Sequence, residues 1–103
     1  MNIQFSYKNV SARDKSFLND YIDKKVDRIK TLVKGEDYQN AFFEVRVEKF
    51  AKKEAFKVEL YFSFPGKDFK SSEDDHTVIE AFDLALDKLI IQLRKYREGL
   101  KKN

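Results

Sequence analysis

Residues 56–64 read FKVELYFSF and decide the fold of this chain. Apolar and polar side chains alternate along them without interruption, which is the period of a β-strand with one buried face. The apolar side is bulky and carries Phe56, Val58, Leu60, Phe62 and Phe64. The opposite side is mostly polar, so the sequence predicts a sheet with one face in the core and the other in solvent.

Weaker signals predict three further strands. Residues 1–7 and 41–50 alternate in the same way as the central stretch. The pair Pro65-Gly66 follows that stretch, and glycine accepts the positive φ that the third position of a type II turn requires. This turn predicts a hairpin into a fourth, shorter strand around Phe69.

Two longer segments have the 3.6-residue period of amphipathic helices. The first follows Ser11, whose hydroxyl can accept hydrogen bonds from the free N–H groups of a first helical turn. Its apolar stripe runs to Val33, and Gly35 is predicted to end it. The second helix opens with the capping box formed by Thr77 and Glu80, and its stripe continues almost to the end of the chain.

The resulting order, β-α-β-β-β-α, predicts an α+β protein with one domain over residues 1–103. The helix between the first two strands implies a right-handed crossover and parallel pairing, whereas the later short turns imply antiparallel pairing. Both helices should cover the apolar face of a four-stranded mixed sheet. We therefore expect a two-layer sandwich.

Composition excludes several classes of protein. Hydrophobic residues make up 42% of the 103 residues, enough for a packed core despite 38% charged residues. Cysteine is absent, which excludes disulfides and thiolate sites and fits a reducing cytosol, so we expect a cytoplasmic protein. No apolar run approaches the roughly 18 residues that a membrane helix needs, and the alternating N-terminus is unlike a signal peptide.

Catalytic and metal-binding residues are scarce. The single histidine, His76, follows Glu73, Asp74 and Asp75, and could belong either to a metal site or to an exposed acidic loop before a helix. The spacing matches no zinc or calcium motif, so we favour the loop. One histidine, no cysteine and three glycines leave no catalytic set and no phosphate loop. We expect a protein that is not an enzyme and uses no metal, cofactor or small-molecule substrate.

Charge is segregated along the last helix. Residues 73–87 hold six acids and no bases, whereas residues 88–103 hold six bases and one acid. This order complements the helix dipole, but that effect fades within a turn and the basic stretch spans about four. The first helix adds further bases on its polar side, so the two helices could present one positive ridge to RNA phosphates. An ordinary solvated surface is the alternative.

The same residues resemble the ribosome hibernation-promoting factors and the related ribosome-associated inhibitor. Residues 77–96, TVIEAFDLALDKLIIQLRKY, are similar to the family pattern D-x-Y-x-A-I-D-x-x-x-D-K-L-x-x-Q-L-x-K, with Ala81, Asp83, Asp87, Lys88, Leu89, Gln92, Leu93 and Lys95 in register. Asn9-Val10, KKVDRI at residues 24–29 and VRVEK at residues 45–49 also match. Ile91 departs from the pattern, because a basic residue is common there.

The resemblance implies a fold like that of double-stranded RNA-binding domains and a place on the small ribosomal subunit, in the channel for mRNA and the A- and P-site tRNAs. Translation would be inhibited by occlusion. By position, the RNA contacts implied are Lys25, Arg28, Lys88, Lys95 and Arg97, with weaker contributions from Lys24, Arg94, Lys101 and Lys102. The chain resembles the short form of the family, which is associated with ribosome dimerisation alongside a second factor.

Two other functions remain open from the sequence. Phe42, Phe50 and Tyr61 lie on the polar side of the predicted sheet, where they could serve a protein–protein interaction module. A generic double-stranded RNA-binding domain would instead bind any A-form duplex with similar affinity.

Overall fold

The computed structural model describes residues 1–101, with side chains as far as Leu100. The predicted RNA contacts of Lys101 and Lys102 therefore fall outside the side chains that it describes. The elements along the chain are β1 (Asn2–Lys8), α1 (Ala12–Lys30), α2 (Gly35–Gln39), β2 (Phe42–Lys49), β3 (Phe56–Phe64), β4 (Lys67–Asp75) and α3 (Val78–Lys101).

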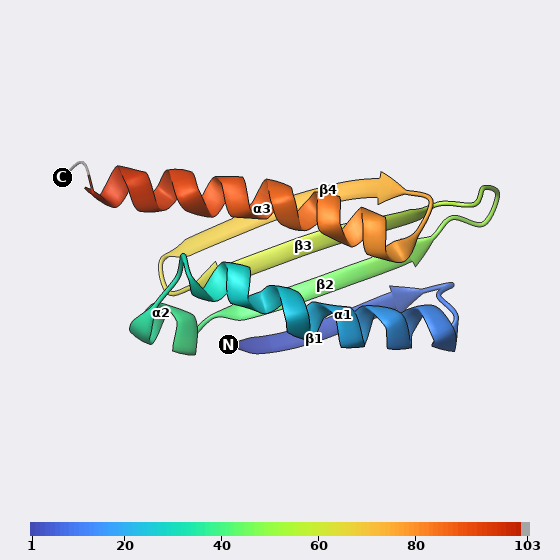
Figure 1. The fold of residues 1–103 in the computed structure, drawn as a ribbon, viewed down its shortest axis with the longest axis horizontal. Coiled ribbons are helices and arrows are strands. Elements are labelled where there is room, and N and C mark those ends of the chain that lie inside the picture. Colours follow the sequence, from blue (N-terminus) through green and yellow to red (C-terminus); the bar gives the residue numbers. More distant parts are fainter. Residues whose placement is uncertain (102–103) are drawn as a thin grey trace.

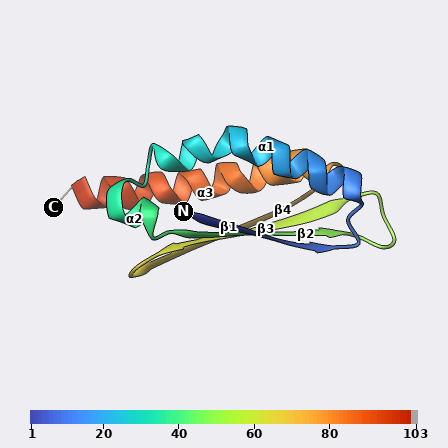
Figure 2. The same cartoon turned by 90° about the horizontal axis from the view of Figure 1, so that it is seen from below.

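The strands form one mixed sheet in the order β1-β2-β3-β4. β1 pairs in parallel with β2, whereas β2–β3 and β3–β4 are antiparallel. Both α1 and α3 lie on the same face of this sheet, and the other face is left open (Figure 1, Figure 2). The predicted α+β class, two-layer arrangement and strand pairing are confirmed.

The core lies between the sheet and the two long helices, and β3 is at its centre. Every second residue of β3 is buried, as the alternating sequence predicts. The ring of Phe62 is fully buried, with its centroid 6.0 Å from that of Phe43, 6.1 Å from Phe64 and 6.5 Å from Phe69. α3 closes this aromatic cluster with a stripe of buried side chains: Val78, Phe82, Ala85, Leu86, Leu89 and Leu93.

Side-chain caps begin both long helices at the predicted residues. The backbone N–H of Asp14 donates to Ser11 Oγ at 3.1 Å, and that of Glu80 donates to Thr77 Oγ1 at the same distance. Each cap satisfies an N–H group that has no partner within its helix.

The first helix ends earlier than predicted. Its last turn tightens because the N–H of Leu32 bonds to the carbonyl of Ile29, while the Thr31 hydroxyl donates to the carbonyl of Arg28. Val33 is buried as expected, but from a turn beyond the helix. Gly35, with a φ of +63°, begins the short helix α2 instead of ending α1, so the predicted stop was wrong.

The fourth strand is longer than predicted. β4 has nine residues, as many as β3, although six of them are charged. It includes Glu73, Asp74 and Asp75, so the predicted acidic loop is part of a strand. The strand pairs with β3 along its whole length, from Phe64↔Lys67 to Phe56↔Asp75. On its other edge, Gln92 Nε2 of α3 donates to the carbonyl of Lys70 at 2.7 Å and Lys88 Nζ to that of Ser72 at 3.4 Å. These donors satisfy carbonyls on the outer edge of a strand that has little apolar side-chain surface.

Replacing Phe62 with alanine should lower the free energy of unfolding by about 3–5 kcal/mol, because it leaves a cavity among packed rings. Phe17→Ala removes the same atoms from a side chain that is 49% exposed, and should cost less than about 1 kcal/mol. Urea denaturation of the two variants measures both values. Similar losses would contradict the position of the core.

Candidate nucleic-acid interface

α1 and α3 lie side by side and run in the same direction (Figure 1). Arg28 Nη1 of α1 lies 2.9 Å from Asp87 Oδ1 of α3. Further along, Arg97 Nη1 donates to the carbonyl of Thr31, the residue that caps the end of α1, at 3.4 Å. The C-terminal halves of the two helices, which carry most of their bases, are therefore neighbours.

Five of the predicted RNA contacts line the boundary between these helix halves, and we call them the basic seam: Lys24, Lys25, Arg28, Arg94 and Arg97. Arg28 and Arg97 touch the opposite helix directly. Lys24 precedes Arg28 by four residues and Arg94 follows Asp87 by seven, so helical periodicity places them on the same flanks. Lys25 Nζ lies over the ring of Tyr21, 5.2 Å from its centroid.

Lys88 and Lys95 lie on the other flank of α3. Lys88 Nζ reaches Glu73 Oε1 in β4 at 2.8 Å, and Lys95 lines a shallow hollow together with Gln92 and Lys67. The predicted single ridge is instead two rows, because residues 88 and 95 project about 100° around the helix from residues 87 and 94. Lys67 of β4 lines the same hollow and was not among the predicted contacts. We call Lys67, Lys88 and Lys95 the β4 flank.

Two of the predicted contacts are already in ion pairs. Arg28 pairs with Asp87 and Lys88 with Glu73, and their side chains are 37% and 54% exposed. Exposed pairs of this kind contribute about 0–1 kcal/mol, so an RNA phosphate can compete for the base. Lys24, Arg94 and Lys95 form no ion pair with any described residue within 4.0 Å. These three are the most available cations of the predicted set.

Tyr21 connects α1 to α3 next to the basic seam. Its hydroxyl donates to the carboxylate of Asp83, with distances of 2.7 and 2.8 Å to the two oxygens. The Tyr21 ring also meets Phe82 edge-on, with centroids 6.2 Å apart. Burial, followed by the hydrogen bond to Asp83, raises the pKa of Tyr21 to about 12. This contact links the two helices one turn before the bases begin.

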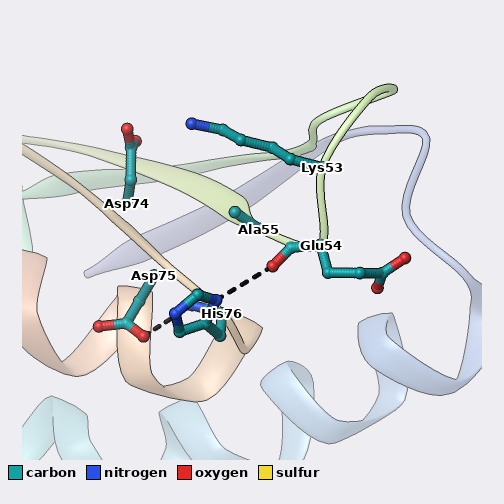
Figure 3. Close-up of a pocket in the computed structure, with 6 residues that line it drawn as sticks. All are labelled: Lys53, Glu54, Ala55, Asp74, Asp75 and His76. Atoms are coloured by element: carbon teal, nitrogen blue, oxygen red, sulfur yellow. Dashed lines mark hydrogen bonds between the residues drawn. The ribbon is translucent and has the colours of Figure 1, made fainter.

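His76 belongs to a second hollow, which it lines together with Lys53, Glu54 and Asp75 (Figure 3). Its Nδ1 lies 3.2 Å from the carbonyl of Glu54, and its backbone N–H donates to Asp75 Oδ1 at 2.6 Å. That bond lowers the pKa of Asp75, and a hydrogen bond with Asp75 raises the pKa of Glu80. Asp74 points away from His76 in Figure 3. Within residues 1–101, no three His, Asp or Glu side chains are grouped as a metal site.

The open face of the sheet has balanced charge. Lys57 lies between Glu48 and Asp74 in the strand register. Tyr61 is flanked by cations, with Arg46 Cζ 4.9 Å and Lys70 Nζ 5.3 Å from its ring centroid. Because positive and negative side chains alternate here, this face offers no concentrated positive field to a phosphate backbone.

Raising the pH should lower the free energy of unfolding, because Tyr21 ionises. Its pKa is raised from 10.0 to about 12, so the stabilisation from the neutral phenol is complete below pH 10 and is lost as the pH rises to about 12. Phenolate absorbance should show a late titration near pH 12 that is missing in Tyr21→Phe. In the same variant, unfolding free energy should fall less over this range. An unchanged titration curve in Tyr21→Phe would contradict the assignment.

None of the helices within residues 1–101 has the length and apolar composition needed to cross a membrane.

Comparison with known proteins gives a consistent result. The sequence profile described as sigma 54 modulation protein / S30EA ribosomal protein matches residues 3–101. The N-terminal domain of Protein Y from Thermus thermophilus is 26% identical, with a TM-score of 0.75 over 93% of this chain and 99% of that one. A ribosomal subunit interface protein from Coxiella burnetii shares the fold at 20% identity, with a TM-score of 0.73 over 95% and 99% of the two chains.

No curated protein sequence matches the chain significantly. The profile match covers nearly the whole chain, and the resemblance to the hibernation-promoting factors is confirmed. The chain belongs to the sigma 54 modulation protein / S30EA ribosomal protein family, a family of ribosome-associated proteins.

Proposed function

We propose that this chain binds the small ribosomal subunit through ribosomal RNA and occludes the channel used by mRNA and by the A- and P-site tRNAs. Occlusion holds the ribosome inactive without making or breaking a bond, so the chain acts without catalysis. Membership of a ribosome-associated family supports the partner. The observation that carries the RNA-binding surface is the parallel packing of α1 and α3, which gathers the basic seam at one end of the helix layer.

The seam suits a phosphate backbone for an electrostatic reason. Lysine and arginine side chains that replace condensed counterions gain free energy from ion release, and this gain grows with the number of contacts. Lys24 and Arg94 stand on the two sides of the seam and form no ion pair with described residues. A phosphate strand following the seam would meet bases from both helices.

The β4 flank supplies a second row of contacts. Lys95 and Lys67 line one hollow there, and Lys88 lies two turns before Lys95 on the same side of α3. The crest of α3 between seam and flank carries Ile91, which is 50% exposed. An apolar side chain at this position would meet ribose or base surface, because a phosphate gives it no favourable contact.

Reversing two charges of the basic seam should weaken ribosome binding. Lys24→Glu combined with Arg94→Glu places two acids where RNA phosphates are expected, so we expect at least a tenfold loss, about 1.4 kcal/mol or more. Co-sedimentation with small subunits at low salt measures this loss.

Lys52→Glu with Lys53→Glu makes the same change of net charge in the loop between β2 and β3 and is the matched control. It should bind like the wild type. Equal weakening by both double variants would mean that net charge alone matters, and unchanged binding by the seam variant would overturn the proposed surface.

Single lysine removals should separate available bases from paired ones. Lys95→Ala should reduce the magnitude of the negative slope of log K against log salt by about one. Lys88→Ala should lower it less, because Lys88 is already paired with Glu73. Ribosome binding across a salt series measures both slopes, and a larger effect of Lys88→Ala would contradict the ion-pair argument.

A random RNA duplex serves as competitor in the same assay. Weak competition is the expected result, because the proposed site is shaped by ribosomal RNA and its channel. Competition as strong as that of unlabelled small subunits would favour a generic double-stranded RNA-binding domain instead.

A further inference from the structure

The hollow on the β4 flank combines aromatic rings with two lysines. It lies where the first residues of β4 pass the C-terminal half of α3 (Figure 1), and its volume is about 410 Å³. Its lining consists of Lys67, Asp68, Phe69, Gln92, Lys95 and Tyr96. The lysines serve the proposed function as phosphate contacts, whereas the rings have no role there.

The ring of Tyr96 forms part of the wall and is held in place by the core. Its centroid lies 5.8 Å from that of Phe64 and 5.7 Å from that of Phe69, and both contacts are edge-on. Phe64 and Phe69 are buried, whereas Tyr96 is only half-buried. A ring that is already fixed loses little conformational entropy when a ligand packs against its exposed part.

One face of the Tyr96 ring is open to a charged group. Lys67 Nζ lies over the ring, 5.4 Å from its centroid. The attraction of an exposed cation to an aromatic ring is modest, and the lysine side chain is long and flexible. A flat π-system can therefore take the place of the ammonium group on Tyr96, and the ammonium group can then move to a nearby anion.

The charges around the hollow favour an anionic ligand. Lys67 and Lys95 supply two cations, and neither forms an ion pair with a described residue within 4.0 Å. Phe69 and Ser71 are buried on the helix side of β4, so strand alternation directs the carboxylate of Asp68 to the open face of the sheet. The two lysines would repel a basic peptide.

The hollow also has a free hydrogen-bond acceptor and an uncovered side. Gln92 Nε2 donates to the carbonyl of Lys70, which fixes the amide group, and its oxygen has no hydrogen-bond partner among the described residues. Gly99 follows Tyr96 by three residues on the same side of α3, and a Cβ at Gly99 would meet no atom within 4 Å. The helix therefore leaves this end of the hollow open.

We propose that the hollow binds an unpaired base of ribosomal RNA, which stacks on Tyr96 while Lys67 and Lys95 hold the neighbouring phosphates. This inference rests on the proposed function, because it names the RNA group that the β4 flank takes. Proteins bind single-stranded RNA by stacking its bases on aromatic side chains and by following its phosphates with cations. Such stacking tolerates any base, since every base has a π-face.

Tyr61 on the open face also has cations over its ring, but it is a poorer site for a base. Its hydroxyl donates to Glu59 Oε2 at 3.0 Å, and Glu44 faces it in the strand register. Carboxylates this close repel the phosphates that a base brings with it. Tyr61 therefore serves as the matched control for Tyr96.

A nuclear magnetic resonance titration of the wild-type chain tests the site. The probes are hexauridylate, an abasic hexamer with the same phosphate backbone, and hexaglutamate. Hexauridylate should shift the backbone resonances of Lys67, Tyr96 and Gly99 and should bind more tightly than the other two probes, which offer charge without a base.

Three variants assign the effect to the ring. Tyr96→Leu should weaken hexauridylate binding about fivefold or more, and should remove its advantage over the abasic hexamer. Tyr96→Phe keeps the ring and should bind like the wild type, as should Tyr61→Leu. Circular dichroism confirms that each variant is folded.

On ribosomes, Tyr96→Leu should weaken co-sedimentation with small subunits by a similar factor. The slope of log K against log salt should stay unchanged, because no charge is lost. If Tyr96 only held Lys95 in position, the slope would change as it does in Lys95→Ala.

Several results would overturn the base site. They are equal binding of hexauridylate and the abasic hexamer, equal or tighter binding of hexaglutamate, and shifts centred on Tyr61. Wild-type affinity of Tyr96→Leu for small subunits would also overturn it. A chain that binds hexauridylate at Tyr96 but binds no small subunit would contradict the proposed function and leave the base site standing.

Discussion

The bulky apolar side chains of β3 must be removed from water, and α3 does this by lying along the strand with its own apolar stripe against them. Phe62 and Phe82, both fully buried, belong to the two sides of this contact. Once α3 is placed, its flanks are placed too: one meets β4 and the other meets α1. The positions of the exposed bases of α3 follow from this single packing arrangement.

Periodicity was sufficient to predict the elements that have apolar residues on one face and polar residues on the other. The alternation of residues 56–64 and the long stripe of the last helix correspond directly to β3 and α3. It failed at β4 and at the end of α1. β4 is polar and has little apolar periodicity, and it is held by pairing with β3 and by donors from α3, which its own sequence does not reveal. α1 ends where local hydrogen bonds of Thr31 and Leu32 tighten the backbone, although the apolar spacing continues to Val33.

The candidate interface shows the same limit. The sequence identified the bases, and the family resemblance selected among them, but neither could decide on which side of α3 each base lies. Asp87 and Lys88 are adjacent in sequence, yet Asp87 reaches Arg28 of α1 and Lys88 reaches Glu73 of β4. Because one residue along a helix changes direction by about 100°, a run of bases becomes two separate rows. A ridge can be predicted from sequence only when the neighbouring element is known.

We propose that the basic seam lies against ribosomal RNA inside the channel of the small subunit. A cryo-electron microscopy reconstruction of purified ribosomes saturated with the protein would show where the chain binds. We expect density for the whole two-layer fold in the path of mRNA and the A- and P-site tRNAs, with Lys24 and Arg94 facing phosphates. Density elsewhere on the ribosome, or a molecule in the channel with its open sheet face against the RNA, would contradict it.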